Sequence, residues 1–416
     1  MGVREKRVTI IGGGIVGLCS AYYAVQKGYE VVVLERDSEE HLSASFGNAG
    51  MVVPSHFIPL AAPGMISKGL RWMLSSKSPF CVKPRLNRDL MRWGRLFWKH
   101  ANPEHTEVCK GLLAEMSLRS RELFKELQKD LDFTLEKKGL LMLCKTQKTF
   151  DGEAKVAEMG AALGVKAEVC DAKRLSEIDP SIQMDVKGGV WFEQDCHLTP
   201  SEVMTKLRSK LESMGVEMIY NSEVVDIHVR NGVAETVELS NKEKIPCSQL
   251  LVTGGAWTSA LLKSIGLRLP MEAGKGYSLT LPTPRVQPQL CSILCEAKVA
   301  VTPMDSQLRF AGTMEIGGLN LKVNKNRIQG IVNSVNKYFP EYSAQDFDGV
   351  APWVGLRPCS PDGLPYLGRI PQASNVVVAT GHGMMGVSLA PVTGQIVADL
   401  LDVEDASEQL LPNRFG

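Results

Sequence analysis

Cysteine pairs of the kind that bind zinc or close disulfides are missing from this sequence. Its ten cysteines include no C-x-x-C pair, and only Cys291 and Cys295 lie close together, with no His near them. We therefore expect no metal site. Reduced thiols buried in the core are the simpler interpretation, and they are typical of a protein kept in the cytoplasm.

An excess of charge and long apolar runs are missing as well. Lys and Arg total 47 against 46 Asp and Glu, a net charge of +1, which argues against a nucleic-acid partner. No window approaches the ~18 apolar residues of a membrane span. No apolar signal region precedes the first expected strand, so we expect a cytoplasmic protein. The length of 416 residues predicts about two domains.

Glycine, by contrast, is concentrated at the start of the chain. Residues 8–17 read VTIIGGGIVG, with Gly12, Gly14 and Gly17 in the order G-x-G-x-x-G after a β-branched strand. In such a motif the first glycine makes a tight turn, the second lets the backbone approach a pyrophosphate, and the third allows close helix packing. A helix over residues 15–27 would direct unpaired N–H groups at the phosphates.

A second expected strand, residues 29–34, ends on Glu35, in the place of an acid that binds a ribose hydroxyl. An ordinary strand-to-helix turn is the alternative, but the full series of strand, glycines, helix, strand and acid favours a dinucleotide site. Glu35 would repel a 2′-phosphate. The motif alone does not separate FAD from NAD.

The loop at residues 43–54, SASFGNAGMVVP, follows this strand. Ser45, Asn48 and Gly50 offer a hydroxyl, an amide and bare backbone, which suit a pyrophosphate, a ribitol or a flavin edge. A plain surface loop explains the same composition equally well.

Residues 65–100 are rich in Lys, Arg and Trp, with Asp89 as their only acid. A helix expected from Leu86 would have one face with Arg88, Arg92, Arg95 and Lys99 and another with Leu90, Trp93 and Phe97. With such a helix, the segment of residues 68–99 could lie on the cytoplasmic face of an anionic membrane. Packing of its aromatic side chains onto the protein's own core is the favoured alternative.

Two further strand–glycine–helix junctions are expected far along the chain. One follows residues 249–252 and contains Gly254 and Trp257. The other follows residues 376–379 and leads into a helix expected from Val387. A capping box of Thr199 and Glu202 is expected to start another helix. Residues 271–281, 299–303 and 307–313 alternate as antiparallel strands do. A nucleotide-binding domain assembled from separated segments is therefore expected.

The C-terminal third contains G-L-R-P at 355–358, P-D-G-L-P at 361–365, G-H-G at 381–383 and A-P-V-T-G at 390–394. With the N-terminal glycine motif, this series resembles the D-amino-acid oxidase superfamily of FAD enzymes over nearly the whole chain. The loop SFGNAGMVVPSH and the basic Trp-rich segment are most similar to the bacterial D-amino-acid dehydrogenase small subunit and to hydroxyproline dehydrogenases.

The resemblance implies an α/β fold: a glutathione-reductase-like Rossmann FAD domain interleaved with a mostly antiparallel substrate domain. The FAD domain would comprise residues 1–60, 199–265 and 345–416. The substrate domain would comprise residues 61–198, with the basic segment 65–100, and residues 266–344.

The resemblance also implies tightly bound FAD. The residues expected to contact it are Gly12, Gly14, Ile15, Val16, Gly17, Glu35, Arg36, Ser45, Asn48, Ala49, Gly50, Met51, Val224, Gly254, Trp257, Gly355, Arg357, Gly381, His382, Gly383, Met384, Met385, Gly386 and Val387. Sarcosine oxidases of this superfamily attach the flavin through a Cys, and the matching position here is Gly355. Non-covalent FAD is therefore favoured, although Cys359 lies nearby.

Four residues are candidates for contact with the substrate. Arg357 and Arg309 could each clamp a carboxylate with a bidentate guanidinium, or could make structural ion pairs instead. Tyr277 and His56 could border the pocket or simply be packed. His382 is assigned to the flavin environment, because hydride transfer from a neutral amine needs no base.

The expected function is oxidative deamination of D-amino acids or cyclic imino acids, of the D-alanine, D-proline or hydroxyproline type. Hydride would pass from Cα to flavin N5 and the electrons to a quinone or another acceptor. The alternatives are an O₂-using oxidase of the glycine or sarcosine type, a 2-hydroxy-acid dehydrogenase, and a non-catalytic FAD-binding subunit. An NAD enzyme is the weakest alternative. The oligomeric state is not indicated.

Overall fold

The first of two large sheets is assembled from three separate parts of the chain. The computed structural model describes residues 6–40, 43–73, 78–83, 85, 87–402 and 407–416. The sheet has the order β10-β2-β1-β14-β21-β20, in which β20 is antiparallel to β21 and the other pairs are parallel. Its strands are β1 (Arg7–Ile11), β2 (Glu30–Leu34), β10 (Glu217–Ile219), β14 (Gln249–Val252), β20 (Tyr366–Ile370) and β21 (Ala373–Thr380).

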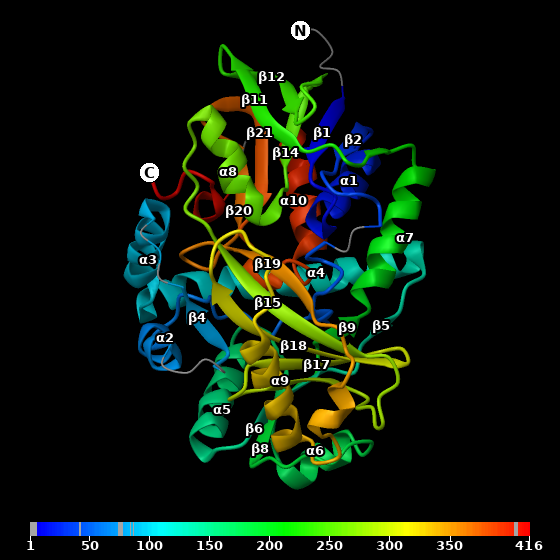
Figure 1. Ribbon diagram of the computed structural model, residues 1–416, viewed down its shortest axis with the longest axis vertical. Coiled ribbons are helices and arrows are strands. Elements are labelled where there is room, and N and C mark those ends of the chain that lie inside the picture. The colour runs from blue at the N-terminus through cyan, green and yellow to red at the C-terminus, as the bar shows by residue number, and fades with distance from the viewer. Residues whose placement is uncertain (1–5, 41–42, 74–77, 84, 86, 403–406) are drawn as a thin grey trace.

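Apolar runs explain why these strands lie inside the molecule. In the register of the sheet, Ile10 lies between Val33 and Leu251, and all three are buried. Parallel strands covered on both faces have such near-continuous runs of branched apolar residues. Figure 1 shows this sheet in the upper half of the molecule, where blue, green and orange strands lie side by side.

Helices cover one face of this sheet. Helix α1 (Ile15–Gln26) packs against α10 (Ala390–Asp402) and beside α7 (Pro200–Ser213), and α4 (Pro103–Leu131) packs against α10 and α7. The opposite face is covered by an antiparallel sheet of β11 (Val224–Arg230), β12 (Val233–Leu239) and β13 (Lys244–Pro246), with α8 (Thr258–Leu262) beside β11.

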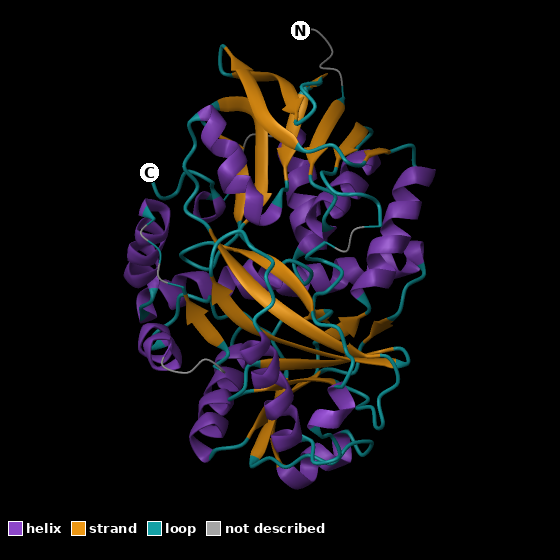
Figure 2. Cartoon of the chain, in the orientation of Figure 1, coloured by secondary structure: helices purple, strands orange, loops and turns teal. Residues whose placement is uncertain are grey.

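The second large sheet is mostly antiparallel and lies in the lower half of the molecule (Figure 2). Its order is β19-β15-β18-β17-β16-β6-β8-β7, with β4 paired to β18. These strands are β4 (Phe80–Val82), β6 (Leu140–Cys144), β7 (Ala167–Asp171), β8 (Gly188–Phe192), β15 (Glu272–Leu281), β16 (Cys291–Leu294), β17 (Val299–Met304), β18 (Gln307–Ile316) and β19 (Trp353–Cys359).

Helices α5 (Gln147–Ala161), α6 (Ala172–Ile178) and α9 (Lys325–Tyr338) pack on the second sheet. A small sheet of β3 (Met51–Val52), β9 (Cys196–Leu198) and β5 (Leu135–Glu136) lies between the two halves, and α2 (Met65–Met73) and α3 (Arg88–His100) form one flank (Figure 1). The expected mixed α/β fold is confirmed.

Two local expectations were wrong. The helix after the third glycine junction begins at Ala390 rather than Val387, because a 3₁₀ turn at Gly383–Met385 comes first. Thr199 precedes α7, but its side chain makes no capping hydrogen bond. The Glu202 carboxylate instead accepts a hydrogen bond from the Thr134 backbone N–H at 3.2 Å, so a tertiary contact replaces the capping box. Leu86, the expected start of α3, lies outside the described residues.

Candidate active site

A cavity of about 440 Å³ opens at the carboxyl ends of β1, β14 and β21. Gly12, Thr253 and His382, which follow these three strands, line it together with residues 354–358 of β19. Ligands of open α/β sheets bind beyond the carboxyl ends of the strands. The three strand–glycine–helix junctions predicted from separate parts of the sequence therefore meet at one site.

Most of the residues predicted to contact a cofactor line this cavity. They are Gly12, Gly14, Ile15, Val16, Glu35, Arg36, Ser45, Asn48, Val224, Gly254, Trp257, Gly355, Arg357, His382, Gly383, Gly386 and Val387. The remaining ones are not among the lining residues: Gly17, Ala49, Gly50, Met51, Gly381, Met384 and Met385.

The first and third glycines of the N-terminal motif are required by close packing. Gly12 has φ of +107°, and a Cβ there would lie 2.8 Å from the Thr253 carbonyl oxygen. A Cβ on Gly17 would lie 2.0 Å from the Gly12 carbonyl oxygen. Any larger residue at position 17 would thus push α1 away from β1, which explains a functional glycine that does not line the cavity.

The amino end of α1 faces the cavity without a side-chain cap, since its N-cap residue is Gly14. The Ile15 N–H donates to Ser45 Oγ at 3.1 Å, which fixes the following loop against the helix. The amino end of a helix carries partial positive charge, and with no side chain on its N-cap residue this end leaves room for a pyrophosphate.

Glu35 is held by the backbone on both sides of its carboxylate. Its Oε2 accepts from the Gly13 N–H at 2.7 Å, and its Oε1 accepts from the Asp37 N–H at 3.1 Å. The carboxylate therefore has a fixed orientation on the cavity wall, as binding of a ribose hydroxyl requires. Next to it, the Arg36 guanidinium stacks 3.7 Å from the centre of the Trp257 ring, which ties the first junction to the second.

Arg309 holds the loop at residues 43–50 from the side of the second sheet. Its Nη1 donates to the carbonyl oxygens of Phe46 at 2.9 Å and Asn48 at 2.7 Å, and its Nε donates to Thr280 Oγ1 at 3.0 Å. Burial lowers the pKa of this guanidinium to about 10. Arg309 does not line the cavity, and its hydrogen bonds indicate that it orders the loop rather than binding a substrate.

The same loop turns sharply at Gly50, which has φ of +73°. A Cβ there would lie 2.2 Å from the Leu198 carbonyl oxygen, and the Gly50 N–H donates to Asn48 Oδ1 at 2.9 Å. Met51 then enters β3 and pairs with His197. The loop is therefore an ordered wall of the cavity rather than a plain surface turn.

Arg357 differs from Arg309 because it lines the cavity, although neither guanidinium has an acidic partner among the residues that the structure describes. Its Nη1 donates to the Thr313 carbonyl oxygen at 2.6 Å, and it forms no ion pair with any residue that the structure describes. A Cβ on Gly276 would lie 2.3 Å from its Nη2, so a glycine on β15 makes room for the guanidinium. Burial lowers its pKa. A half-buried cation without a counterion is available to an anionic ligand, which would offset the cost of its partial desolvation.

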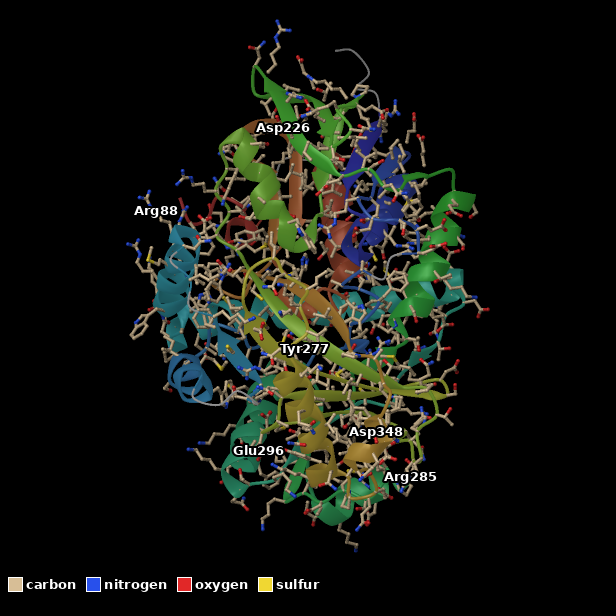
Figure 3. The ribbon with its side chains drawn as sticks, viewed as in Figure 1. Arg88, Asp226, Tyr277, Arg285, Glu296 and Asp348 are labelled. Atoms are coloured by element: carbon tan, nitrogen blue, oxygen red, sulfur yellow. The ribbon has the colours of Figure 1, made fainter. Side chains whose placement is uncertain are left out.

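Tyr277 and His56, the other two predicted substrate contacts, do not line the cavity. The Tyr277 ring belongs to the core of the second sheet, and its hydroxyl accepts from the Asn324 N–H at 3.2 Å (Figure 3). His56 is half-buried, and its Nδ1 lies 2.9 Å from Ser55 Oγ, which in turn donates to Asp195 at 2.5 Å.

His382 lies where the third junction meets β19, forming an isolated bridge with Cys359. Its Nε2 is 2.9 Å from Thr393 Oγ1, and burial lowers its pKa to about 4. The ring is therefore neutral at pH 7, which agrees with a place in the wall of the site rather than a charge-bearing role.

Sequence reasoning missed several lining residues. Thr253 follows β14, and its hydroxyl donates to the Gly12 carbonyl oxygen at 2.9 Å. It adjoins the predicted Gly254 and could have been found from that position. Leu321 lies in a loop of the second sheet, and no motif in the sequence marks it.

All ten cysteines are described and free. In the described part of the chain, no three or more His, Cys, Asp and Glu side chains are grouped to hold a metal ion. The helices described there include none with the length and apolar character needed to cross a membrane.

Comparison with known proteins agrees with this geometry. The chain is 31% identical over 398 residues to a D-amino acid dehydrogenase of Helicobacter pylori, covering 95% of both chains. It is 32% identical over 419 residues to another of Methylobacterium radiotolerans, covering 98% of this chain and 99% of that one. The crystal structure of glycine oxidase from Geobacillus kaustophilus has the same fold, with a TM-score of 0.77 at 21% identity over 97% of this chain and 96% of that chain.

A family model described as FAD dependent oxidoreductase matches residues 7–400, which include the first glycine motif, the loop at residues 43–50, β19 and the third junction. FAD is the cofactor of this family. The amino end of α1 with Gly14 as its N-cap residue, the fixed Glu35 carboxylate and the space left by the glycines fit it. The chain therefore belongs to the family of FAD dependent oxidoreductases.

Proposed function

We propose that the protein is an FAD-dependent dehydrogenase that oxidises the Cα–N bond of D-amino acids or cyclic imino acids. The observation that carries this proposal is Arg357, a half-buried guanidinium on the cavity wall without an acidic partner among the described residues. Such a cation is completed by a substrate carboxylate. The D-amino acid dehydrogenases similar over nearly the full chain support the same substrate class.

Arg357 would bind and orient the substrate. Its Nη1 is already engaged with Thr313, so the rest of the guanidinium is left to bind the carboxylate in a fixed direction. Bound FAD supplies the acceptor for two electrons and a hydrogen. The substrate loses the Cα hydrogen with its electron pair and becomes an iminium ion. Water hydrolyses the iminium ion of a D-amino acid to a keto acid and ammonium, whereas the product of a cyclic imino acid keeps its nitrogen bonded to the side chain. The neutral ring of His382 would keep the wall of the site uncharged.

FAD would be held without a covalent bond. Gly355 stands where sarcosine oxidases carry the attaching Cys, and Cys359 is not among the described residues that line the cavity. The Cys359 Sγ is buried, beside Met314 Sδ at 3.8 Å and the Arg357 carbonyl oxygen at 3.5 Å. Acid precipitation should therefore release the flavin into the supernatant.

The electrons would pass to a quinone at an anionic membrane surface, to which α3 would attach the protein. On α3, Trp98 is 68% and Met91 is 59% exposed, while Trp93 is buried. Arg88, Arg95 and Lys99 are exposed on the same helix. Apolar side chains among cations are the combination that binds anionic lipid headgroups.

Flavin bleaching tests the proposed reaction. The purified protein is mixed without oxygen with D-alanine, D-proline, hydroxyproline, L-alanine or D-2-hydroxyglutarate, and the flavin absorbance is followed. We expect bleaching by D-amino or imino acids and slow reoxidation when O₂ is added, but fast reoxidation by a soluble quinone. Bleaching by the hydroxy acid alone would indicate a 2-hydroxy-acid dehydrogenase, fast reoxidation by O₂ an oxidase, and no bleaching a non-catalytic subunit.

A further inference from the structure

Three exposed apolar side chains lie in one short loop of the second sheet. Residues 317–324 connect β18 to α9 and carry Leu319, Leu321 and Val323 at alternate positions, 49%, 44% and 44% exposed. Single exposed apolar side chains are ordinary, but several in one short loop indicate an interaction surface. The loop is therefore a candidate contact for a partner that offers apolar groups.

Buried polar groups on β15 hold this loop in place. Lys275 is 1% exposed, and its Nζ forms an ion pair at 2.9 Å with Glu315, which is 0% exposed. The same Nζ donates to Asn320 Oδ1 at 3.0 Å and to the Lys322 carbonyl oxygen at 2.7 Å. The chain on both sides of Leu321 is thus fixed, so the loop loses little conformational entropy when it binds a partner.

Cations surround the apolar side chains of the loop. Lys83 and Arg85, from the segment after β4, reach its first residues: a Cβ on Gly317 would lie 3.3 Å from Lys83 Cδ, and a Cβ on Gly318 would overlap the Arg85 guanidinium. Lys322 is exposed within the loop itself. The loop therefore combines apolar side chains with positive charge.

The acids that pair with these cations are buried beneath the loop. Lys83 forms an ion pair with Glu315 at 2.9 Å, and Arg85 forms one at 2.8 Å with Glu272, which is 6% exposed. No residue of the loop 317–324 is acidic. The cations of this region outnumber its acids, and the surface that the loop presents is positively charged.

The loop starts beside α3, the helix proposed above to bind lipid. It follows Ile316, which packs in the same apolar cluster as Trp93 and Phe97 of α3. Arg85, which lies against the loop, comes shortly before α3 begins at Arg88. The exposed apolar and cationic side chains of the loop therefore continue the exposed surface of α3.

An anionic bilayer offers both groups that this surface would bind. Leu and Val side chains can pack at the boundary between headgroups and acyl chains, while Lys and Arg beside them reach the headgroup phosphates. A small dissolved anion would use the cations but leave the apolar side chains in water. The combination favours lipid as the partner.

We propose that loop 317–324 docks on an anionic lipid bilayer together with α3, with Leu319, Leu321 and Val323 inserted among the headgroups. This inference rests on the proposed membrane attachment and adds a second contact to it. Because Leu321 also lines the cavity, the bilayer would adjoin one wall of the cofactor site, where a lipid-soluble electron acceptor can approach.

Co-sedimentation with vesicles tests the inference. The FAD-loaded protein is mixed with vesicles of phosphatidylglycerol and phosphatidylcholine, and the bound fraction is measured at low and high salt. The double variant Leu319→Ala/Val323→Ala should bind about tenfold more weakly, with the same salt dependence as the wild type, because it loses apolar surface only. Lys322→Ala should bind about fivefold more weakly and depend less on salt. Neither Leu319 nor Val323 lines the cavity, so flavin bleaching by the substrate should be unchanged in the double variant.

Val169→Ala/Val233→Ala is the matched control. It removes two exposed apolar side chains from β7 and β12, so its vesicle binding should equal that of the wild type. Equal losses in both double variants would overturn the inference. Loss of a dimer by the loop variant in size-exclusion chromatography, with normal vesicle binding, would assign the loop to a second copy of the chain instead.

The same experiment separates this inference from the membrane proposal on which it rests. If the wild type does not sediment with the vesicles, both fail. If the wild type sediments and Arg88→Ala binds weakly, but the loop double variant binds as the wild type does, only the contact through loop 317–324 is disproved.

Discussion

Arg357 and Arg309 carry the same guanidinium group, but their surroundings give them different tasks. Arg309 donates to two loop carbonyl oxygens and a threonine hydroxyl, whereas Arg357 donates to one carbonyl oxygen and faces the cavity. Both were equally plausible substrate anchors as residue types. The sequence favoured Arg357 through its motif, but only the contacts separate the two.

Replacing Arg357 with Leu tests the carboxylate anchor. Because the substrate would lose a charge-assisted pair, we expect KM to rise and kcat/KM to fall about 100-fold, on the order of 3 kcal/mol. Steady-state kinetics with the amino acid that bleaches the flavin measures this. Arg357→Lys should recover part of the loss, since it restores the charge without the planar fork.

Arg285→Leu serves as the control for Arg357→Leu. Arg285 lies at the lower end of the molecule (Figure 3), where it is exposed. It forms an ion pair with Asp346. Its loss should leave kcat/KM unchanged. A normal KM in Arg357→Leu would place the anchor elsewhere.

At the scale of single elements, α3 shows how one helix combines packing with an exposed surface. Trp93 stacks on Phe97 with ring centres 5.1 Å apart, and its indole N–H donates to the Cys359 carbonyl oxygen at 2.8 Å. The packing expected of the aromatic face is thus present. Trp98 and Met91 nevertheless point outward with Arg88, which Figure 3 shows on the outer side of the helix.

The lipid-binding proposal predicts a specific effect of Arg88. Arg88→Ala should weaken binding to vesicles that contain anionic lipid about fivefold, because each cation near such a surface contributes ~1 kcal/mol. Vesicle co-sedimentation at low and high salt measures the change. Arg285→Ala removes an exposed cation that lies away from α3 and should have no effect. Equal binding by all variants, or binding unaffected by salt, would contradict the proposal.

Element-level prediction succeeded where the signal was local. The strand–glycine–helix series predicted β1, α1 and β2 to within one or two residues, because β-branched runs and glycine turns act through neighbouring residues. The prediction of a capping box on α7 failed because a distant group competes for the same side chain: the Glu202 carboxylate accepts a hydrogen bond from the Thr134 N–H. Leu321 could not be identified either, since its position depends on contacts of Lys275 and Tyr277 from another strand.

At the scale of the whole molecule, we propose the two-domain division expected from the sequence, with one qualification. The long helix α4, which falls within the expected substrate domain, packs on elements of the FAD-binding sheet. Its Ser120 hydroxyl donates to the Ser388 carbonyl oxygen at 2.6 Å, and its Asp130 accepts from the Tyr22 hydroxyl of α1 at 2.7 Å. We infer that α4 moves with the FAD domain.

Stability should fall as the pH is lowered from 7 to 4. Burial lowers the pKa of His197 and His382 to about 4. These two side chains therefore take up protons near pH 6.5 in the unfolded chain but only near pH 4 in the folded chain. Each histidine then lowers the free energy of unfolding by up to ~3 kcal/mol. Asp195 acts in the opposite sense, because burial raises its pKa to about 7 and the folded state takes up that proton first.

Urea unfolding between pH 4 and 8 measures this balance. His197→Gln should make the free energy of unfolding fall less between pH 7 and pH 4, whereas Asp195→Asn should make it fall more, because it removes an opposing proton uptake. If the two variants changed the slope in the same direction, the assignment of these groups would be wrong.

The position of β21 has a consequence for biosynthesis. The cavity is closed by β21 and the third junction, and β21 pairs with β14, which itself pairs with β1. A nascent chain that has already emerged as far as β14 therefore has two walls of the cofactor site and lacks the third. FAD can be captured in its final position only after nearly the entire polypeptide has left the ribosome, so cofactor loading is a late event and a chain truncated before residue 373 should be made as an apoprotein.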